Sequence, residues 1–181
     1  GLKALMRQDP DVIMIGEIRD LDSATIAMQA AMTGHLVLST LHTKSAWETI
    51  ERLMNMGVPS YILASGLDVI IAQRLVRRLC PHCMERYDAD KSEIDIIEWM
   101  LKDIGMWEVA AKREGYTLYK WKWCEACGMS GYKGRIWVYE VLFFSDNIRA
   151  LIRSGGSPRE IIELARKWDL MLMREDGILN A

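Results

Sequence analysis

Two Cys-x-x-Cys pairs constrain this chain more than any other feature, because together they use all four of its cysteines. Each pair can place two thiolates on one side of a tight turn, and two such turns form the tetrahedral sulfur site that zinc accepts. The four candidate ligands are Cys80, Cys83, Cys124 and Cys127. Forty residues separate the pairs, whereas common zinc ribbons have about 15–20 there. The pattern therefore predicts a metal site that closes the base of an inserted subdomain.

Other uses of such pairs compete with a structural metal. Disulfides are disfavoured in a cytoplasmic protein, and a redox Cys-x-x-Cys motif needs only one pair. A catalytic zinc needs an open coordination position for water, which four cysteines do not leave. His82 stands between two of the ligands, and a surface turn residue is the simpler interpretation of it. The pairs thus indicate structural zinc and say little about activity.

The composition is that of an ordinary soluble domain. Half of the 181 residues are apolar and 27% are charged, which is enough apolar material for a core. The net charge of −2 gives no global electrostatic reason to expect nucleic acid or membrane binding. No stretch approaches the roughly 20 apolar residues that cross a bilayer, and residues 1–9 do not resemble a signal peptide. We expect a soluble, cytoplasmic protein.

Strand and helix signals alternate in the first part of the chain. Residues 12–15 form a short apolar run that is typical of a buried parallel strand. Apolar residues at helical spacing predict a helix over 23–33, and residues 35–41 are the next strand candidate. A Ser-x-x-Glu capping box then predicts a helix over 45–56. This order predicts a βαβ unit with a parallel sheet.

The later part of the chain has weaker signals. An amphipathic pattern predicts a helix over 92–104, and alternating aromatic and basic residues predict a half-exposed strand over 119–123. Residues 135–144 are a second strand candidate. A further capping box, with proline at the first helical position, predicts a helix from 157 to about 168.

A carboxylate and two histidines stand at the ends of the predicted strands. Glu17 follows the first strand, where P-loop nucleotide hydrolases place a carboxylate that holds Mg²⁺ or polarises a water. A solvated loop residue is the competing interpretation. His35 and His42 bracket the second strand, and a separation of seven puts them on opposite faces of a regular strand. One would be buried, and the other would face the crevice where α/β proteins bind ligands; a structural role is the alternative for either.

Further motifs are spread in order over nearly the whole chain. They are Arg7-Gln8-Asp9-Pro10-Asp11, Gly16-Glu17-Ile18-Arg19-Asp20, Thr33-Gly34-His35, Ser39-Thr40-Leu41-His42-Thr43, residues 72–80, the two cysteine pairs, Gly131-Tyr132-Lys133-Gly134-Arg135 and Glu175-Asp176-Gly177. Together they resemble the traffic ATPases of type II secretion and type IV pilus assembly. In that family the Gly-Glu-Ile-Arg-Asp run is the Walker B box, and the two-histidine segment is the His box.

The resemblance implies roles for four residues. Glu17 would be the catalytic glutamate that activates water or supports Mg²⁺, and Arg19 would support the Walker B end. His35 and His42 would sense or contact the γ-phosphate region of ATP, and the sequence leaves open which of them does so. The family forms cytoplasmic hexameric rings docked on an inner-membrane platform protein, and its ATP turnover drives pilin or pseudopilin assembly. The tetracysteine site indicates the assembly and secretion branch.

Departures from the family pattern qualify this expectation. Lys44 stands where Asn is usual and Trp137 where Gly is common, and neither position belongs to the expected chemistry. The chain has no Gly-x-x-x-x-Gly-Lys-[Ser/Thr] motif to wrap phosphates, and the family's upstream acidic box is also missing. We therefore expect the C-terminal half of a motor ATPase that does not hydrolyse ATP by itself.

The alternative is a zinc-stapled interaction module without turnover. Residues 112–135 are locally basic, and Trp121 and Trp123 alternate there with Lys120 and Lys122. Such a surface could bind an acidic partner, lipid headgroups or nucleic acid. A solvated edge strand, whose lysines prevent sheet aggregation, is the competing interpretation.

The predicted fold class is α/β, with a partial RecA-like P-loop core, an inserted tetracysteine zinc subdomain and C-terminal helices. Residues 1–79 would be the C-terminal part of the ATPase core, with the Walker B and His boxes. Residues 80–135 would form the zinc subdomain, and 136–181 a C-terminal strand and helices. A truncated sheet would leave an apolar face exposed, so we expect association between copies or limited stability.

Overall fold

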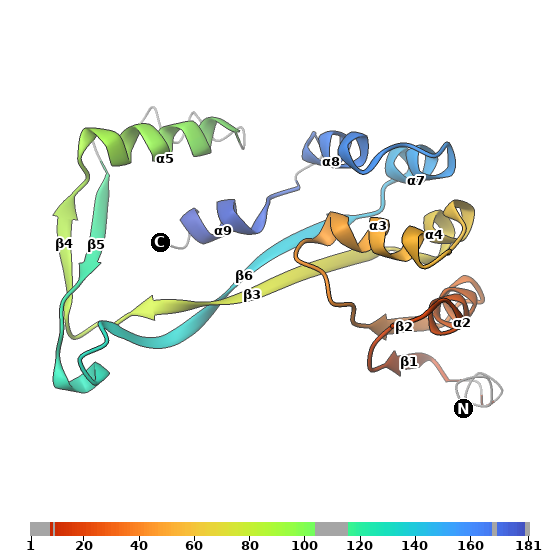
Figure 1. Ribbon diagram of the computed structural model, residues 1–181, viewed down its shortest axis with the longest axis horizontal. Helices are drawn as coiled ribbons and strands as arrows, with labels where there is room; N and C mark the ends of the chain where they lie inside the picture. The colour runs from red at the N-terminus through yellow and green to blue at the C-terminus, as the bar shows by residue number, and fades with distance from the viewer. Residues whose placement is uncertain (1–7, 9, 104–115, 168–169, 180–181) are drawn as a thin grey trace. The chain divides into compact units, whose positions relative to one another are not determined.

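The computed structural model describes residue 8 and residues 10–103, 116–167 and 170–179 (Figure 1). The chain divides into two compact units. The first contains Gly1–Ala72 and Val141–Leu170, and the second contains Gln73–Glu140 and Met171–Ala181. Parts of four sequence features lie outside the described residues: the first motif at positions 7 and 9, the basic segment at 112–115, and the ends of two predicted helices at 104 and 168.

The predicted strand–helix–strand unit is present in the first unit. Strand β1 (Val12–Ile15) pairs in parallel with β2 (Leu36–Ser39), and helix α2 (Leu21–Met32) connects them and packs against β2 (Figure 1). The helix begins after Asp20, whose Oδ1 accepts the Ser23 N–H at 2.8 Å. That bond satisfies one of the free donors at the helix start.

The prediction that β1 is fully buried is wrong. Ile13 is buried, but Val12 and Met14 are exposed, as are Leu36 and Leu38, their partners in β2. Paired residues of neighbouring strands point to the same face, so these four side chains form one exposed apolar face. On the opposite face Ile13 is buried, and Ile15 and Val37 are half-buried. The exposed apolar face agrees with the expectation.

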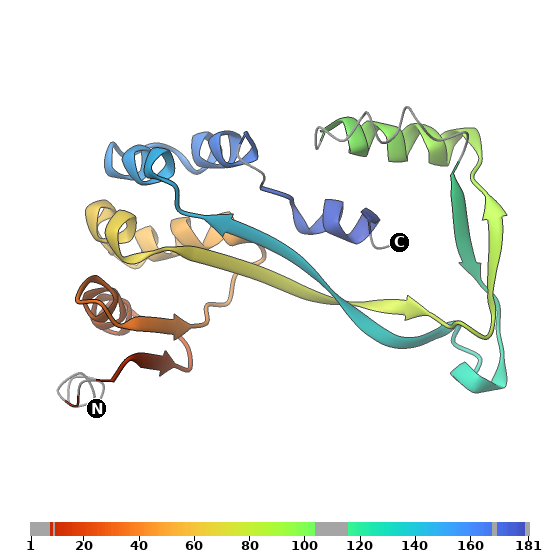
Figure 2. The ribbon, with the colours of Figure 1, turned by 180° about the vertical axis from the view of Figure 1, so that it is seen from behind.

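Four helices build most of the core of the first unit. They are α3 (Ala46–Asn55), α4 (Ser60–Gly66), α7 (Asp146–Arg153) and α8 (Pro158–Arg166). Helix α4 packs against α7 and α3 against α8, and both views show these pairs side by side (Figures 1 and 2). Their buried apolar residues are Ile50, Leu53, Leu63, Ile148, Ile152 and Ile161. Arg149 ties α7 to α4, because it donates to the Ala64 carbonyl at 2.5 Å and to Asp68 at 2.6 Å.

The two predicted capping boxes differ in outcome. At α8 both halves are present, since Ser157 Oγ accepts the Glu160 N–H and Glu160 accepts the Ser157 N–H. At α3 the box is incomplete, because Ser45 makes no side-chain cap bond. Glu48 instead accepts the N–H of Lys44 at 2.9 Å. The carboxylate therefore caps one residue earlier than the pattern predicts.

Strand β3 (Val69–Leu79) pairs with β6 (Tyr132–Phe143), which confirms the predicted second strand. Each of these strands begins in one unit and ends in the other. The second unit also holds β4 (Met84–Asp88), α5 (Lys91–Asp103), β5 (Thr117–Trp121), the 3₁₀ turn η2 (Glu125–Cys127) and α9 (Met173–Leu179). Strands β4 and β5 form an antiparallel pair, and α5 is the predicted amphipathic helix.

Among the described residues of the second unit, a small apolar cluster lies around β4, β5 and α5. Leu101 and Tyr116 are buried there, and Ala89, Ile94 and Ile97 pack against them. Glu175 is also buried and accepts the Leu172 N–H at 2.7 Å. These described apolar side chains supply limited burial energy. None of the helices described for either unit is long and apolar enough to cross a membrane.

Candidate functional site

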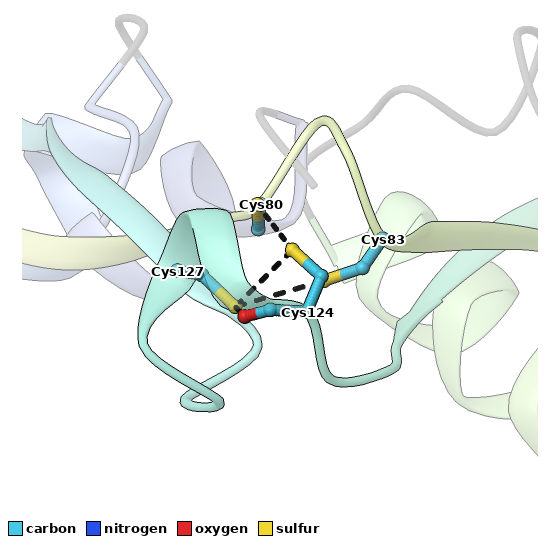
Figure 3. A group of neighbouring side chains, drawn as sticks. All are labelled: Cys80, Cys83, Cys124 and Cys127. Carbon is cyan, nitrogen blue, oxygen red and sulfur yellow. Dashed lines mark hydrogen bonds between the residues drawn. The ribbon is translucent and has the colours of Figure 1, made fainter.

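The four cysteines come together in one cluster (Figure 3). Cys80 and Cys83 lie in the turn between β3 and β4, Cys124 directly precedes η2, and Cys127 is the last residue of η2. All four sulfur atoms lie within 4.8 Å of one another, with Sγ–Sγ distances of 3.9 Å for Cys80–Cys124 and for Cys83–Cys127. Zinc–sulfur bonds of about 2.3 Å in a tetrahedron place sulfurs about 3.8 Å apart. The cluster therefore has the dimensions of a tetrathiolate metal site.

Backbone hydrogen bonds hold the two cysteine loops together. The Cys80 N–H donates to the Gly131 carbonyl at 2.9 Å, and the Lys122 N–H donates to the Cys83 carbonyl at 3.0 Å. Within the second loop the Met129 N–H returns to the Cys124 carbonyl at 3.0 Å. The ligands are thus oriented by main-chain bonds as well as by any metal they share.

The thiols differ in acidity. Burial is the main cause that raises the pKa of Cys83 to about 12, and hydrogen bonds with the other thiols add to it. Burial also raises the pKa of Cys127, but hydrogen bonds that involve the backbone of Cys124 and Gly131 outweigh it and lower that pKa to about 6. Ligation requires thiolates, so a bound cation would supply the charge that ionises Cys83. Four closely grouped sulfurs favour a closed structural site over a redox pair.

A second cluster lies where β1 and β2 end. The Glu17 carboxylate forms an ion pair with Arg19, and its Oε2 lies 3.2 Å from Nε2 of His42. The hydrogen bond from Arg19 is the main cause that lowers the pKa of Glu17; partial burial opposes it, and the charges of Arg19 and His42 reinforce it. Glu17 is therefore ionised at neutral pH. Its Oε2 is buried and makes no hydrogen bond that meets the geometric criteria within the described part of the chain, although Nε2 of His42 lies 3.2 Å away.

Thr40 fixes the backbone on both sides of Glu17. Its hydroxyl donates to the Gly16 carbonyl at 2.7 Å, and its carbonyl accepts the Ile18 N–H at 3.0 Å. Two residues later in the chain, His42 reaches the carboxylate. The segment after β2 thus positions both members of the Glu17–His42 pair.

A pocket of about 400 Å³ opens at this cluster. Its lining residues are Glu17, Ile18, Arg19, Leu41, His42, Arg52 and Met56. One carboxylate, two guanidinium groups and an imidazole therefore share a pocket at the carboxyl end of a parallel strand pair, where α/β proteins bind ligands. These groups can contact phosphate oxygens and orient a water molecule. The sequence reasoning missed Arg52; the helix predicted to start shortly after His42 was the signal that could have found it.

The structure does not bring His35 to this pocket. Nδ1 of His35 lies 3.1 Å from the Ala30 carbonyl and 3.2 Å from Thr33 Oγ1, at the end of α2. Strand β2 is shorter than expected, so His35 precedes it and His42 follows it. Neither histidine lies within the strand, so the alternation of its two faces does not decide where the two side chains point. A role for His35 near nucleotide stays a prediction.

Comparison with known proteins gives consistent results. All 181 residues match the family model described as type II/IV secretion system protein. The type IV pilus assembly ATPase PilB of Thermus thermophilus is 46% identical over 181 residues, which are 100% of this chain and 19% of that protein. Type II secretion system protein E of Pseudomonas aeruginosa is 46% identical over 98% of this chain and 33% of its own length. Type II secretion system ATPase E of Vibrio cholerae is 41% identical with the same two coverages.

Comparison with solved structures gives evidence about the fold. The pilus retraction motor PilT with bound ADP matches 97% of this chain and 41% of its own, at 25% identity and a TM-score of 0.51. The ATPase DotB of Legionella pneumophila matches 99% of this chain and 37% of its own, at 21% identity and a TM-score of 0.60. These likenesses support an α/β ATPase fold. The chain spans between a fifth and a third of the length of the three curated relatives named above.

Proposed function

The chain belongs to the type II/IV secretion system protein family, and on that premise we propose that it forms the C-terminal part of a cytoplasmic hexameric ATPase that drives pilin or pseudopilin assembly. The relatives named as PilB and as secretion ATPases support this assignment. In the same proposal β1 and β2 belong to a RecA-like core, the ring docks on an inner-membrane platform protein, and the machinery lies at the cytoplasmic face of that membrane.

The observation that carries the catalytic part is the pocket around Glu17. An ionised carboxylate whose Oε2 lacks a hydrogen bond can accept one from a water molecule or face the hydration shell of Mg²⁺. Arg19 keeps that carboxylate charged and oriented. His42 and Arg52 line the same pocket and can contact phosphate oxygens. ATP with Mg²⁺, when bound, supplies the phosphoryl group that is cleaved.

The chain by itself is proposed to be inactive in hydrolysis. It has no Gly-x-x-x-x-Gly-Lys-[Ser/Thr] sequence to cradle phosphates, and the described lining of the Glu17 pocket contains two arginines and one histidine. Phosphoryl transfer depends on positioning and charge stabilisation, which this pocket supplies in part. Full activity would therefore need a phosphate-binding loop in addition to the pocket described here.

Phosphate release in a chimaera tests both statements. In it this chain replaces the matching segment of the Vibrio cholerae ATPase E, to which it is 41% identical over 178 residues. We expect turnover by the chimaera, none by the chain alone, and a loss of about 10²–10⁴-fold in kcat for Glu17→Gln in the chimaera. Glu163→Gln, an exposed carboxylate on α8, is the matched control and should leave kcat unchanged. Turnover by the chain alone, or full activity of Glu17→Gln, would contradict the proposal.

The cysteine cluster is proposed to hold one structural zinc ion. Its sulfur spacing and its four thiol donors fit a closed tetrahedral site. Metal analysis of the purified chain should give one zinc per chain, and cobalt substitution should give the absorption of a tetrahedral tetrathiolate. Cys83→Ser should lower the stoichiometry, whereas His82→Ala should leave it unchanged. A metal-free chain with full stability would overturn the assignment.

A further inference from the structure

Aromatic side chains lie exposed beside the cysteine loops. Trp121 and Trp123 are 44% and 64% exposed, and their ring centroids are 6.0 Å apart in an edge-to-face arrangement. The Tyr132 ring lies 6.2 Å from that of Trp121, and the guanidinium of Arg77 lies 4.0 Å above the Tyr132 ring. These four residues, all in the unit that holds the cysteines, are called the aromatic platform below. Exposed aromatic groups of this size commonly mark interaction sites.

The register of β4 and β5 explains why Trp121 faces solvent. Side chains alternate between the two faces of a strand pair, and the hydroxyl of Tyr87 donates to Glu93 of α5 at 2.8 Å. Tyr87 therefore belongs to the face toward the helix. Tyr119 and Trp121 belong to the other face, where each remains 44% exposed.

The platform is held rigidly by the backbone around the cysteines. Gly131 has φ of +76°, and a Cβ at this position would lie 2.8 Å from the Trp121 ring. The Trp121 ring is thus packed directly against the Gly131 backbone. The Gly131 carbonyl accepts a hydrogen bond from the Cys80 N–H. A surface fixed in this way loses little conformational entropy when a partner binds.

The two chain segments that carry the platform are rich in basic residues. Residues 73–88 and 116–135 contain eight Lys or Arg side chains and three Asp or Glu side chains, which is a net charge of +5. Zinc with four thiolates would contribute −2 and leave +3. The whole chain has a net charge of −2, so the basic character is local. Electrostatic complementarity favours an acidic partner.

We propose that the aromatic platform binds an acidic polypeptide segment of a partner protein. Trp, Tyr and Arg are the residue types that dominate the binding energy of protein interfaces. The Trp121 ring packs against the Gly131 backbone, which suits contact with a polypeptide better than insertion into a bilayer. The cysteine cluster then has a purpose beyond stability, because it fixes the loops that present these side chains. The proposal is independent of the chemistry at Glu17.

Fluorescence anisotropy with a defined probe tests the proposal. The probe is a fluorescein-labelled peptide of repeated Glu-Glu-Leu-Phe units, titrated with the zinc-loaded chain at two salt concentrations. We expect saturable binding that weakens with salt, and a loss of at least about tenfold in affinity for the double variant Trp121→Ala/Trp123→Ala. Trp137→Ala is the matched control: it is 46% exposed and stacks on Tyr139, outside the platform. Its affinity should stay within twofold of the wild type.

Other occupants are separated by parallel titrations. Tighter binding to phosphatidylglycerol vesicles or to a single-stranded oligothymidylate than to the peptide would overturn the proposal, as would self-association that depends on Trp123. Equal affinity of the double variant and the wild type would also overturn it. Zinc content and melting temperature are measured for every variant. If the double variant loses zinc, Trp123→Ala combined with Lys133→Glu takes its place, with the same expected loss.

Discussion

The cysteine cluster and the Glu17 pocket differ in how complete they are. All four sulfurs of the cluster come from this chain. The Sγ–Sγ distance is 3.9 Å both for Cys80–Cys124 and for Cys83–Cys127, and backbone hydrogen bonds hold their loops together. The pocket holds one carboxylate, Glu17, with partners that are largely exposed: 75% for Arg19 and 90% for His42. A structural site can be finished by one chain. A catalytic pocket must stay open to a substrate and to the groups that close over it.

The same difference appears in the surroundings of the two sites. The cluster lies in a unit where the described apolar core is small, so a metal bound by the four thiols would supply much of the stability of its loops. The pocket lies on a unit with a core of six fully buried large aliphatic side chains on α3, α4, α7 and α8. That unit does not depend on its pocket for folding. Disturbing the first site should therefore unfold its surroundings, whereas disturbing the second should alter chemistry and lower stability only slightly.

Removing the metal is the strongest way to test this contrast. Structural zinc sites contribute up to about 10–16 kcal/mol in small metal-dependent domains, which is more than the apolar contacts described around Leu101 can replace. We expect a chelator to abolish the hydrogen-exchange protection of residues 80–88 and 116–131. Protection of α2, α4 and α7 should remain. Mass spectrometry of exchanged peptides measures both regions in one experiment.

The matched control for metal removal is Leu53→Ala in the core of the other unit. This change should cost about 2–5 kcal/mol and reduce protection around α3 while zinc content stays at its wild-type value. Protection of residues 80–88 after complete chelation would show that the loops fold without metal, and the contrast between the two sites would fail.

Substitution of Thr40, beside the Glu17 pocket, should have a smaller effect than metal removal. Thr40→Val removes the hydroxyl that bonds to the Gly16 carbonyl, which should destabilise the chain by about 1 kcal/mol. In the chimaera the same change should lower kcat by about ten- to a hundredfold, because Glu17 loses its fixed position. Thr40→Ser keeps the hydroxyl and should restore most of the activity. Urea midpoints and kcat at saturating ATP measure the two effects.

A purely structural role for Thr40 predicts a different pattern. Thr40→Val would then shift the urea midpoint without changing kcat at a temperature where the variant is folded. Thr43, whose hydroxyl lies 2.9 Å from that of Thr49 outside the pocket, provides the comparison. Thr43→Val should change stability and leave kcat near the wild-type value.

Local patterns predicted many of the elements, although not β3, β4 or α4, and they predicted side-chain placement less well. The strand after residue 11, the helix at 91–103 and the proline-capped helix at 158 follow from periodicity and capping residues. The cysteine cluster follows from spacing alone, because two Cys-x-x-Cys turns have few other ways to be satisfied. The burial of β1 could not be predicted from its own residues. It depends on what packs against each face of the sheet.

The two histidines also show that local sequence does not predict where a side chain lies at the candidate site. Both stand near a strand end in the sequence, yet Nδ1 of His35 contacts the Ala30 carbonyl while His42 reaches Glu17. The length of β2 decides this, and strand ends are set by hydrogen bonding between strands rather than by local propensity. Arg52 enters the pocket through the packing of α3, which no short motif encodes.

A change in the pKa of Glu17 is the smallest effect that we expect, and it tests one specific interaction. Its pKa lies below the ordinary value of 4.5, chiefly because Arg19 donates a hydrogen bond to it. Arg19→Ala should therefore raise the pKa of Glu17, which a carbon-13 NMR titration of the side-chain carboxyl measures directly. Arg159→Ala, which removes the exposed Arg159–Glu163 pair of α8, should leave the pKa of Glu17 unchanged.

The lowered pKa also fixes the direction of the pH dependence. A carboxyl whose pKa is lower in the folded state stabilises the fold above its unfolded pKa, and this contribution is lost as the pH falls through the folded pKa. Wild-type and Arg19→Ala chains should therefore differ most in urea midpoint near neutral pH and converge under acid conditions. The difference should be small, because the Arg19 guanidinium is largely exposed and solvent screens the pair. A constant difference at every pH would show that Arg19 acts through packing instead of through the charge on Glu17.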